Sequence, residues 1–131
     1  MNKEFVPYEL ADKLKNLGFD ETCFGYWNID PYLPNPTFNL VKPFDHEWCI
    51  PAPLYQQAFR WFREKYRLVI QYIPSELDNS EGQSILHHQY KISEYDSWRG
   101  GRRNTVETEL NEDYEEAELA CLIKLIEITR P

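Results

Sequence analysis

Tyr55-Gln-Gln-Ala-Phe-Arg-Trp-Phe-Arg-Glu-Lys-Tyr-Arg-Leu-Val-Ile-Gln-Tyr-Ile73 joins a helical pattern directly to a strand pattern, and this stretch determines the class of fold. Its first part repeats apolar side chains at intervals of three and four residues, which predicts an amphipathic helix over residues 54–66. Its second part is an apolar run rich in β-branched residues, which predicts a central strand over residues 67–73 that ends at Pro74. Helix and strand therefore occur side by side in one chain.

The pattern Tyr-x-x-Ala occurs three times, beginning at Tyr8, Tyr55 and Tyr114. Each copy opens a stretch with helical apolar spacing, and its alanine lies one turn after its tyrosine. Each helix would therefore present a large ring beside a small residue that lets another element approach closely. Because the flanking residues differ, we interpret the pattern as one packing solution used three times. The helices that we expect cover residues 7–17, 54–66 and 112–129.

Between these helices the sequence favours short strands and turns. Strands are predicted over residues 22–27, 37–42, 84–93 and 102–108, with residues 43–53 irregular. Gly25 within the first strand indicates a bulge or a close approach of backbone. Successive antiparallel strands are the simplest connection. The prediction is an α+β fold, with a mostly antiparallel sheet and about three helices on one face, in one small domain over residues 1–131 with a subdomain break near 43–53.

Composition bounds the class of protein. The chain has 131 residues, of which 42% are apolar and 15% aromatic, so it can bury a core without disulfide or metal staples. Its three cysteines are Cys23, Cys49 and Cys121, an odd number without CxxC spacing. The first residues lack an apolar signal segment, and no apolar run approaches the ~20 residues of a membrane helix. We therefore expect a soluble cytoplasmic protein without membrane contact.

The formal net charge is −8, and most of the excess lies in the second half of the chain. Residues 67–131 hold seven basic and thirteen acidic side chains, and residues 107–118 alone hold seven acidic side chains and no basic one. This balance disfavours nucleic acid as a partner and favours a basic one. The simplest interpretation of the acidic cluster is that Asp113, Glu115 and Glu116 complement the start of a helix.

The last predicted helix has a second apolar arc, formed by Leu119, Leu122, Ile123 and Ile126. A helix that is apolar nearly all round is buried on two sides. Within a small domain it would lie between the sheet and another helix. The alternative is a homodimer or partner interface along that arc.

The sequence predicts no catalytic residue, no cofactor and no metal ion. The one compact cluster of metal-ligating residue types is Asp45-His46-Glu47-Trp48-Cys49, and its spacing is not that of a zinc site. His87 and His88 would point to opposite faces of a strand, so they would not chelate together. Cys49 lacks neighbouring cations that would activate its thiol. No glycine-rich phosphate loop is present.

The candidate partner-binding residues are Trp61, Trp98, Arg99, Arg102 and Arg103. Four of them surround the Gly100-Gly101 pair, and arginine beside aromatic rings is typical of phosphate contacts and of protein-binding hot spots. A hairpin tip whose arginines only keep a sheet edge soluble is the simpler interpretation. Trp61 lies off the main apolar face of its helix, where it would cover a neighbouring strand or contact a partner.

Three segments resemble a family of short hypothetical proteins found in phage and prophage regions of bacteria. They are residues 8–21, 58–66 and 114–128, which carry the three predicted helices. The likeness does not extend across the loops of residues 30–53 and 75–111. The resemblance implies an intracellular protein of a phage or mobile element, and it implies no activity and no site residue.

Together these observations lead to one expected function and two alternatives. We expect a non-catalytic accessory protein of a phage or prophage that acts through protein–protein contacts. The first alternative is a nucleic-acid-related protein, either through the Arg/Trp loop or as an acidic mimic of DNA. The second is an enzyme whose site cannot be recognised from sequence.

Overall fold

The computed structural model describes residues 2–32, 34–40, 48–96 and 101–130, and its elements confirm the α+β class. The chain divides into two compact units, one formed by the chain up to Ala58 and the other by Phe59–Thr129. The division falls inside a helix, and the predictions of one domain and of a break near residues 43–53 stay predictions. The elements in chain order are η1 (Asn2–Glu4), α1 (Tyr8–Asn16), β1 (Gly25–Asn28), β2 (Thr37–Asn39), β3 (Cys49–Ala52), α2 (Tyr55–Tyr66), β4 (Leu68–Asp78), β5 (Ser84–Asp96), β6 (Gly101–Glu107) and α3 (Tyr114–Thr129).

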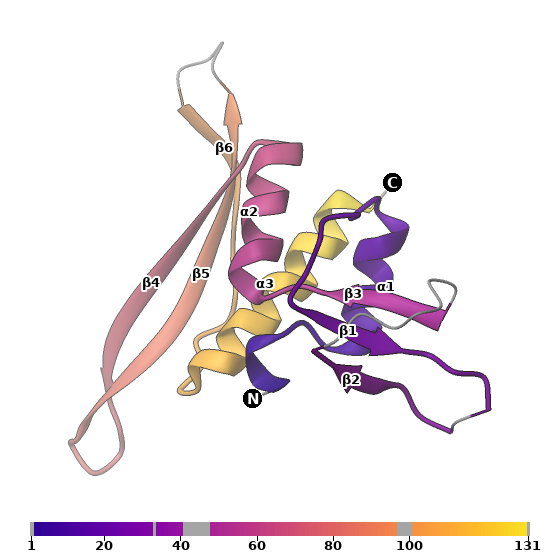
Figure 1. Ribbon diagram of the computed structural model, residues 1–131. Coiled ribbons are helices and arrows are strands. Elements are labelled where there is room, and N and C mark those ends of the chain that lie inside the picture. The colour runs from indigo at the N-terminus through magenta and orange to yellow at the C-terminus, as the bar shows by residue number, and fades with distance from the viewer. Residues whose placement is uncertain (1, 33, 41–47, 97–100, 131) are drawn as a thin grey trace. The chain divides into compact units, whose positions relative to one another are not determined.

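The first unit contains α1 and a three-stranded antiparallel sheet in the order β2-β1-β3 (Figure 1). Helix α1 buries Leu10, Ala11 and Leu14 and contacts β3. It ends as the sequence predicts, because Gly18 adopts a φ of 105° and the following Phe19 N–H donates to the Leu14 carbonyl over 3.0 Å. The apolar face of α1 is thus buried within the unit, and the glycine cap ends the helix.

Aromatic rings hold β1 and β2 together in this unit. Trp27 lies opposite Phe38 in the sheet, with ring centroids 5.3 Å apart, and Phe38 in turn contacts Phe5 at 4.8 Å. The Trp27 indole Nε1–H donates to the Val6 carbonyl over 2.9 Å. The Phe38 ring lies close to the backbone of Gly25, where any side chain at that position would collide with it. This is the close approach that the glycine in the sequence indicates.

Strand β3 corrects the expectation that residues 43–53 are irregular. Residues 48–52 are described, and Cys49–Ala52 pair with β1, with Pro51 opposite Tyr26. Proline lacks the N–H that a central strand must donate, but β3 lies at the edge of its sheet, where that donor is not needed. A short proline-containing strand is therefore stable here.

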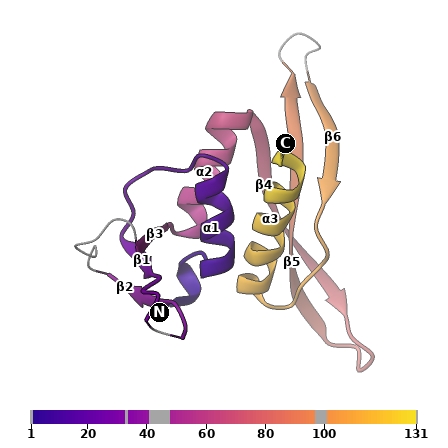
Figure 2. The same ribbon diagram turned by 90° about the vertical axis from the view of Figure 1, so that its right-hand side faces the viewer.

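The second unit contains a long antiparallel sheet in the order β4-β5-β6, with α3 in contact with β5 (Figure 2). Helix α2 also contributes to its core, because Phe59 contacts Tyr90 of β5 with ring centroids 5.5 Å apart. Phe59, Phe62, Leu122, Leu125 and Ile92 are all buried.

Two expectations about β4 are wrong. Pro74 does not end the strand, which continues to Asp78, and β4 lies at the edge of the sheet rather than at its centre. The edge position explains why the strand continues past Pro74. An edge strand accommodates a proline whose missing N–H faces away from the neighbouring strand. The central strand is β5, which pairs with β4 along eleven residues, from Leu68↔Glu94 to Asp78↔Ser84.

The three helices begin at Tyr8, Tyr55 and Tyr114, the first residues of the three Tyr-x-x-Ala copies, and the three alanines are buried. The start of α3 is capped as its acidic sequence predicts, because the Asp113 carboxylate accepts from the Glu115 N–H over 3.0 Å. In the second apolar arc of α3, Leu122 and Ile126 are buried while Ile123 is exposed. The homodimer through this helix stays a prediction.

No helix within the described residues is both long enough and apolar enough to cross a membrane.

Candidate functional site

The sequence candidates fall into three groups. Trp98 and Arg99 lie outside the described residues. Arg102 and Arg103 lie in β6, where their backbones pair with Tyr95 and Glu94 of β5. The prediction that this arginine-rich hairpin end binds a partner stays a prediction.

Trp61 is 7% exposed. Its ring packs edge-on against Phe62 and Tyr66, with centroids 5.0 and 5.8 Å away, and the Lys65 ammonium lies 4.8 Å from its centre. A ring held in this way has a packing role within its own helix. Contact of Trp61 with a partner remains an untested prediction.

The candidate metal cluster falls largely outside the described residues, which do not include residues 45–47. Across the described part of the chain, no group of three or more His, Cys, Asp or Glu side chains could hold a metal ion. Cys23, Cys49 and Cys121 are buried, and none of the three is part of a disulfide bond within the described residues.

The structure brings together a set of aromatic side chains that are not among the candidate residues predicted from the sequence. We call it the tyrosine–histidine cluster, and its members are Tyr72 of β4, His88 and Tyr90 of β5, and Tyr114 of α3. Tyr72 is 40% and Tyr114 37% exposed, whereas Tyr90 is buried. Tyr72 and Tyr114 are therefore accessible to solvent, whereas Tyr90 belongs to the core.

Strand register explains why these residues meet. Tyr72 lies directly opposite Tyr90, and Pro74 lies opposite His88, so Tyr72 and His88 are diagonal neighbours on one face of the sheet. Beyond β6, Asn111 pairs with His88 through two backbone hydrogen bonds of 2.6 and 2.9 Å. These bonds fasten the start of α3 to β5 and so place Tyr114 beside the strand residues.

The rings of the cluster are held by mutual contacts. Tyr72 stacks on His88 at a centroid distance of 5.7 Å, and the Tyr72 hydroxyl is hydrogen-bonded to His88 Nδ1. Tyr114 lies edge-on to both rings, 5.5 Å from Tyr72 and 5.4 Å from His88. The Tyr90 hydroxyl donates to the Tyr114 hydroxyl over 3.1 Å. Exposed aromatic side chains are thus pre-arranged rather than free to rotate, which lowers the entropy cost of binding.

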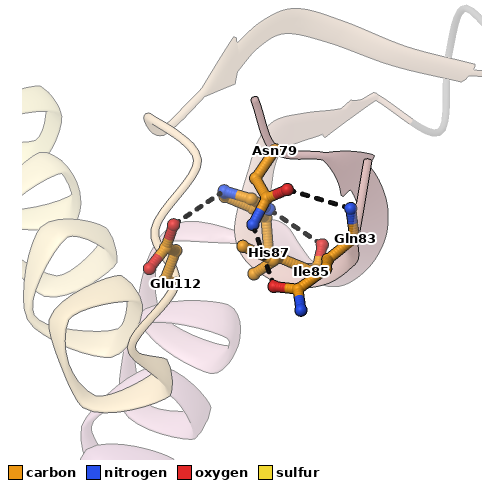
Figure 3. A network of polar contacts seen from close by, with 5 residues as sticks. All are labelled: Asn79, Gln83, Ile85, His87 and Glu112. Atoms are coloured by element: carbon orange, nitrogen blue, oxygen red, sulfur yellow. Dashed lines mark hydrogen bonds and ion pairs between the residues drawn. The ribbon is translucent and has the colours of Figure 1, made fainter. Parts of the chain in front are cut away.

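A second group of polar contacts involves the hairpin of β4 and β5 and Glu112, which precedes α3 (Figure 3). His87 Nδ1 contacts the Ile85 carbonyl at 3.1 Å, and its Nε2 lies 3.8 Å from Glu112 Oε1. At the hairpin turn, the side-chain carbonyl oxygen of Asn79 accepts from the Gln83 N–H over 2.9 Å. His87 and His88 are neighbours in β5 and so lie on its opposite faces, as the sequence predicts. Their side chains contact different residues.

The surroundings of Tyr114 are strongly acidic. Five of the seven acidic residues in the segment 107–118 lie within four positions of it in sequence, and no lysine or arginine is present there. Asp113, Glu115 and Glu116 are exposed at the start of α3, while Glu118, one turn after Tyr114, is buried. Exposed carboxylates therefore flank Tyr114 on both sides in the chain, and we call these residues, Glu112, Asp113, Glu115 and Glu116, the acidic rim.

The buried groups of this region hold their protons tightly. Burial raises the pKa of Tyr90, and its hydrogen bond to Tyr114 and the nearby Glu118 charge raise it further. Burial also raises the pKa of Cys121, again with a contribution from Glu118. In the first unit, burial raises the pKa of Cys23 to about 12. None of these groups is an activated nucleophile, because activation requires a lowered pKa.

These raised pKa values predict that alkali destabilises the protein. The ordinary pKa of the Cys121 thiol is 9.0, so above that pH the unfolded chain loses a proton that the folded protein retains. The stabilisation is complete below pH 9.0 and is lost as pH rises, by about 1.4 kcal/mol per pH unit for each such group. Urea denaturation at neutral and alkaline pH measures this slope. Cys121→Ala should reduce the slope, and an equal slope in that variant would contradict the assignment.

Comparisons of the chain with protein-family models, with curated proteins and with solved structures found no match. The chemistry of the site itself therefore has to indicate the function.

Proposed function

We propose that this protein is a non-catalytic binding protein that holds a basic segment of a partner protein on the tyrosine–histidine cluster. The observation that carries the proposal is the pair of exposed rings, Tyr72 and Tyr114, which His88 and Tyr90 hold in place, with exposed carboxylates on both sides of Tyr114 in the chain. The resemblance of its helices to proteins of prophage regions further supports a role as an accessory protein of a phage or prophage.

The chemistry of the cluster selects a cation. Ring faces of tyrosine attract lysine and arginine side chains within about 6 Å, with about 0.5–2 kcal/mol per contact. Carboxylates at the rim, such as Glu115 and Glu116, add charge complementarity that steers the approach of the partner. The net charge of −8 acts in the same direction at longer range.

The same negative charges disfavour nucleic acid and a second copy of this chain as ligands of the cluster. Nucleic acid would bring its phosphates against Glu112, Asp113 and their neighbours, and like charges in an interface cost affinity. A second copy of this acidic chain would be repelled for the same reason. A protein segment that carries lysine or arginine satisfies both the rings and the rim.

The proposal is tested with a fluorescent hexa-arginine peptide and the purified full chain, using anisotropy at low and moderate salt. We expect saturable binding that weakens by roughly tenfold or more in Tyr72→Ala and Tyr114→Ala, as truncation of aromatic hot-spot residues does. Tyr32→Ala is the matched control, because Tyr32 is 87% exposed in the first unit and should leave the affinity unchanged. Tyr72→Phe keeps the ring and should retain most of the binding.

Two results would overturn the proposal. One is equal affinity for the peptide in the wild type, Tyr72→Ala and Tyr114→Ala, which would show attraction by charge alone. The other is tighter binding of a single-stranded oligonucleotide than of the peptide, which would favour the nucleic-acid alternative.

A further inference from the structure

A pocket on the second unit combines two arginines with an apolar wall. It is a hollow of about 360 Å³ lined by Arg63, Arg67, Leu68, Val69 and Tyr95. This volume lies at the lower end of the roughly 300–1,000 Å³ typical of small-molecule sites. None of these residues belongs to the tyrosine–histidine cluster.

The chain places these side chains through the join of α2 and β4. Arg63 lies one turn before the end of α2, and Arg67 follows directly after the helix. The Arg67 carbonyl accepts from the Tyr95 N–H over 3.1 Å, which ties this junction to β5. Tyr95 is exposed, so its ring is available at the mouth of the hollow.

The backbone of Arg67 is unusual for an arginine. Its φ is 55°, in the left-handed region that glycine or asparagine normally occupies after a helix. Such a conformation is disfavoured for a long side chain and persists when its surroundings hold it. The backbone of Arg67 is held in this conformation where the residue lines the pocket, with its carbonyl bonded to Tyr95.

No residue that the structure describes neutralises these two arginines. Within the described residues, neither Arg63 nor Arg67 forms an ion pair or a side-chain hydrogen bond. Glu94, which is opposite Leu68 in the sheet, instead accepts a hydrogen bond of 3.0 Å from the Asn104 side chain. The carbonyl end of α2 carries only about half a negative charge, so two guanidinium groups leave the pocket positive.

We propose that this pocket binds a small amphipathic oxyanion, a phosphate or carboxylate carried on an apolar body. The guanidinium forks of Arg63 and Arg67 match the oxygens of such a group and donate charge-assisted hydrogen bonds to it. Leu68, Val69 and the Tyr95 ring cover the apolar body. A long polyanion is not the ligand, because the net charge of −8 opposes it.

Phenyl phosphate is the first probe, titrated into ¹⁵N-labelled full-length protein while amide shifts are followed. We expect saturable shifts at Leu68, Val69 and Tyr95, weaker binding of inorganic phosphate, and no such shifts with uncharged benzyl alcohol. Phenylacetate distinguishes the two sources of oxyanion, because binding as tight as that of phenyl phosphate identifies carboxylates as ligands of the same site.

Two variants and one control complete the test. Arg63→Gln and Arg67→Gly should each weaken phenyl phosphate binding by about tenfold, the effect of removing a hydrogen bond to a charged group. Arg67→Gly also relieves the positive φ, so it should not lower the melting temperature. Lys124→Gln removes the same charge from α3, where Lys124 pairs with Glu127, and should bind as the wild type does.

The proposal is overturned if phenyl phosphate does not saturate, if both arginine variants bind it unchanged, or if benzyl alcohol gives the same shifts. These outcomes are independent of the hexa-arginine experiment, because the two sites share no residue.

Discussion

Replacing Phe59 by alanine is expected to lower the free energy of unfolding by about 3–5 kcal/mol, because it deletes a large ring from the core of the second unit. Phe59 is 2% exposed and packs against Tyr90 of β5. Its loss removes apolar contact between α2 and the sheet and leaves a cavity that the surrounding core fills only in part. Urea denaturation followed by circular dichroism measures the change.

The matched control lies further along the same helix. Glu64→Ala changes an exposed residue of α2 and should alter stability by no more than about 0.5 kcal/mol. A loss below about 1 kcal/mol in Phe59→Ala would mean that α2 does not pack on β5 as described.

The second large effect is expected at Gly25, where alanine should cost about 1–3 kcal/mol through overpacking. A Cβ at this position would lie 2.5 Å from Phe38 Cζ, 2.6 Å from Phe38 Cε2 and 3.0 Å from Phe5 Cδ1. The Phe38 ring cannot move freely, because both Phe5 and Trp27 contact it.

A double-mutant cycle separates the clash from the strand-forming tendency of alanine. Phe38→Leu shortens the side chain that meets the new methyl group, so Gly25→Ala should cost less in that background than in the wild type. Thermal denaturation of the four proteins gives the coupling. Equal costs in both backgrounds would contradict the close approach of Gly25 to Phe38.

Local patterns predicted the helices well, because each helix start depends on residues close in sequence. The Tyr-x-x-Ala copies coincide with the first turns of α1, α2 and α3, and Gly18 and Asp113 cap as expected. Strand β3 and the extension of β4 beyond Pro74 were missed. Whether a proline interrupts a strand depends on its place at an edge or in the centre, and distant pairing decides that place.

The same limit applies to the two sites. Tyr72, His88 and Tyr114 come together only through the register of β4 on β5 and the pairing of Asn111 with His88. The one local signal was the alternation at Leu86, His88, Tyr90 and Ile92, which marks one face of β5. For the arginine pocket, Arg63 and Tyr95 are far apart in sequence, and the Arg67–Tyr95 backbone contact joins their elements.

The most direct test of the proposed binding function is an amide-shift titration of the ¹⁵N-labelled full chain with the hexa-arginine peptide. We predict saturating shifts centred on Tyr72, His88 and Tyr114, with little change at Leu68 and Tyr95, because the arginine pocket repels the peptide. Shifts of equal size at every acidic stretch of the chain, without saturation at the cluster, would contradict the proposal.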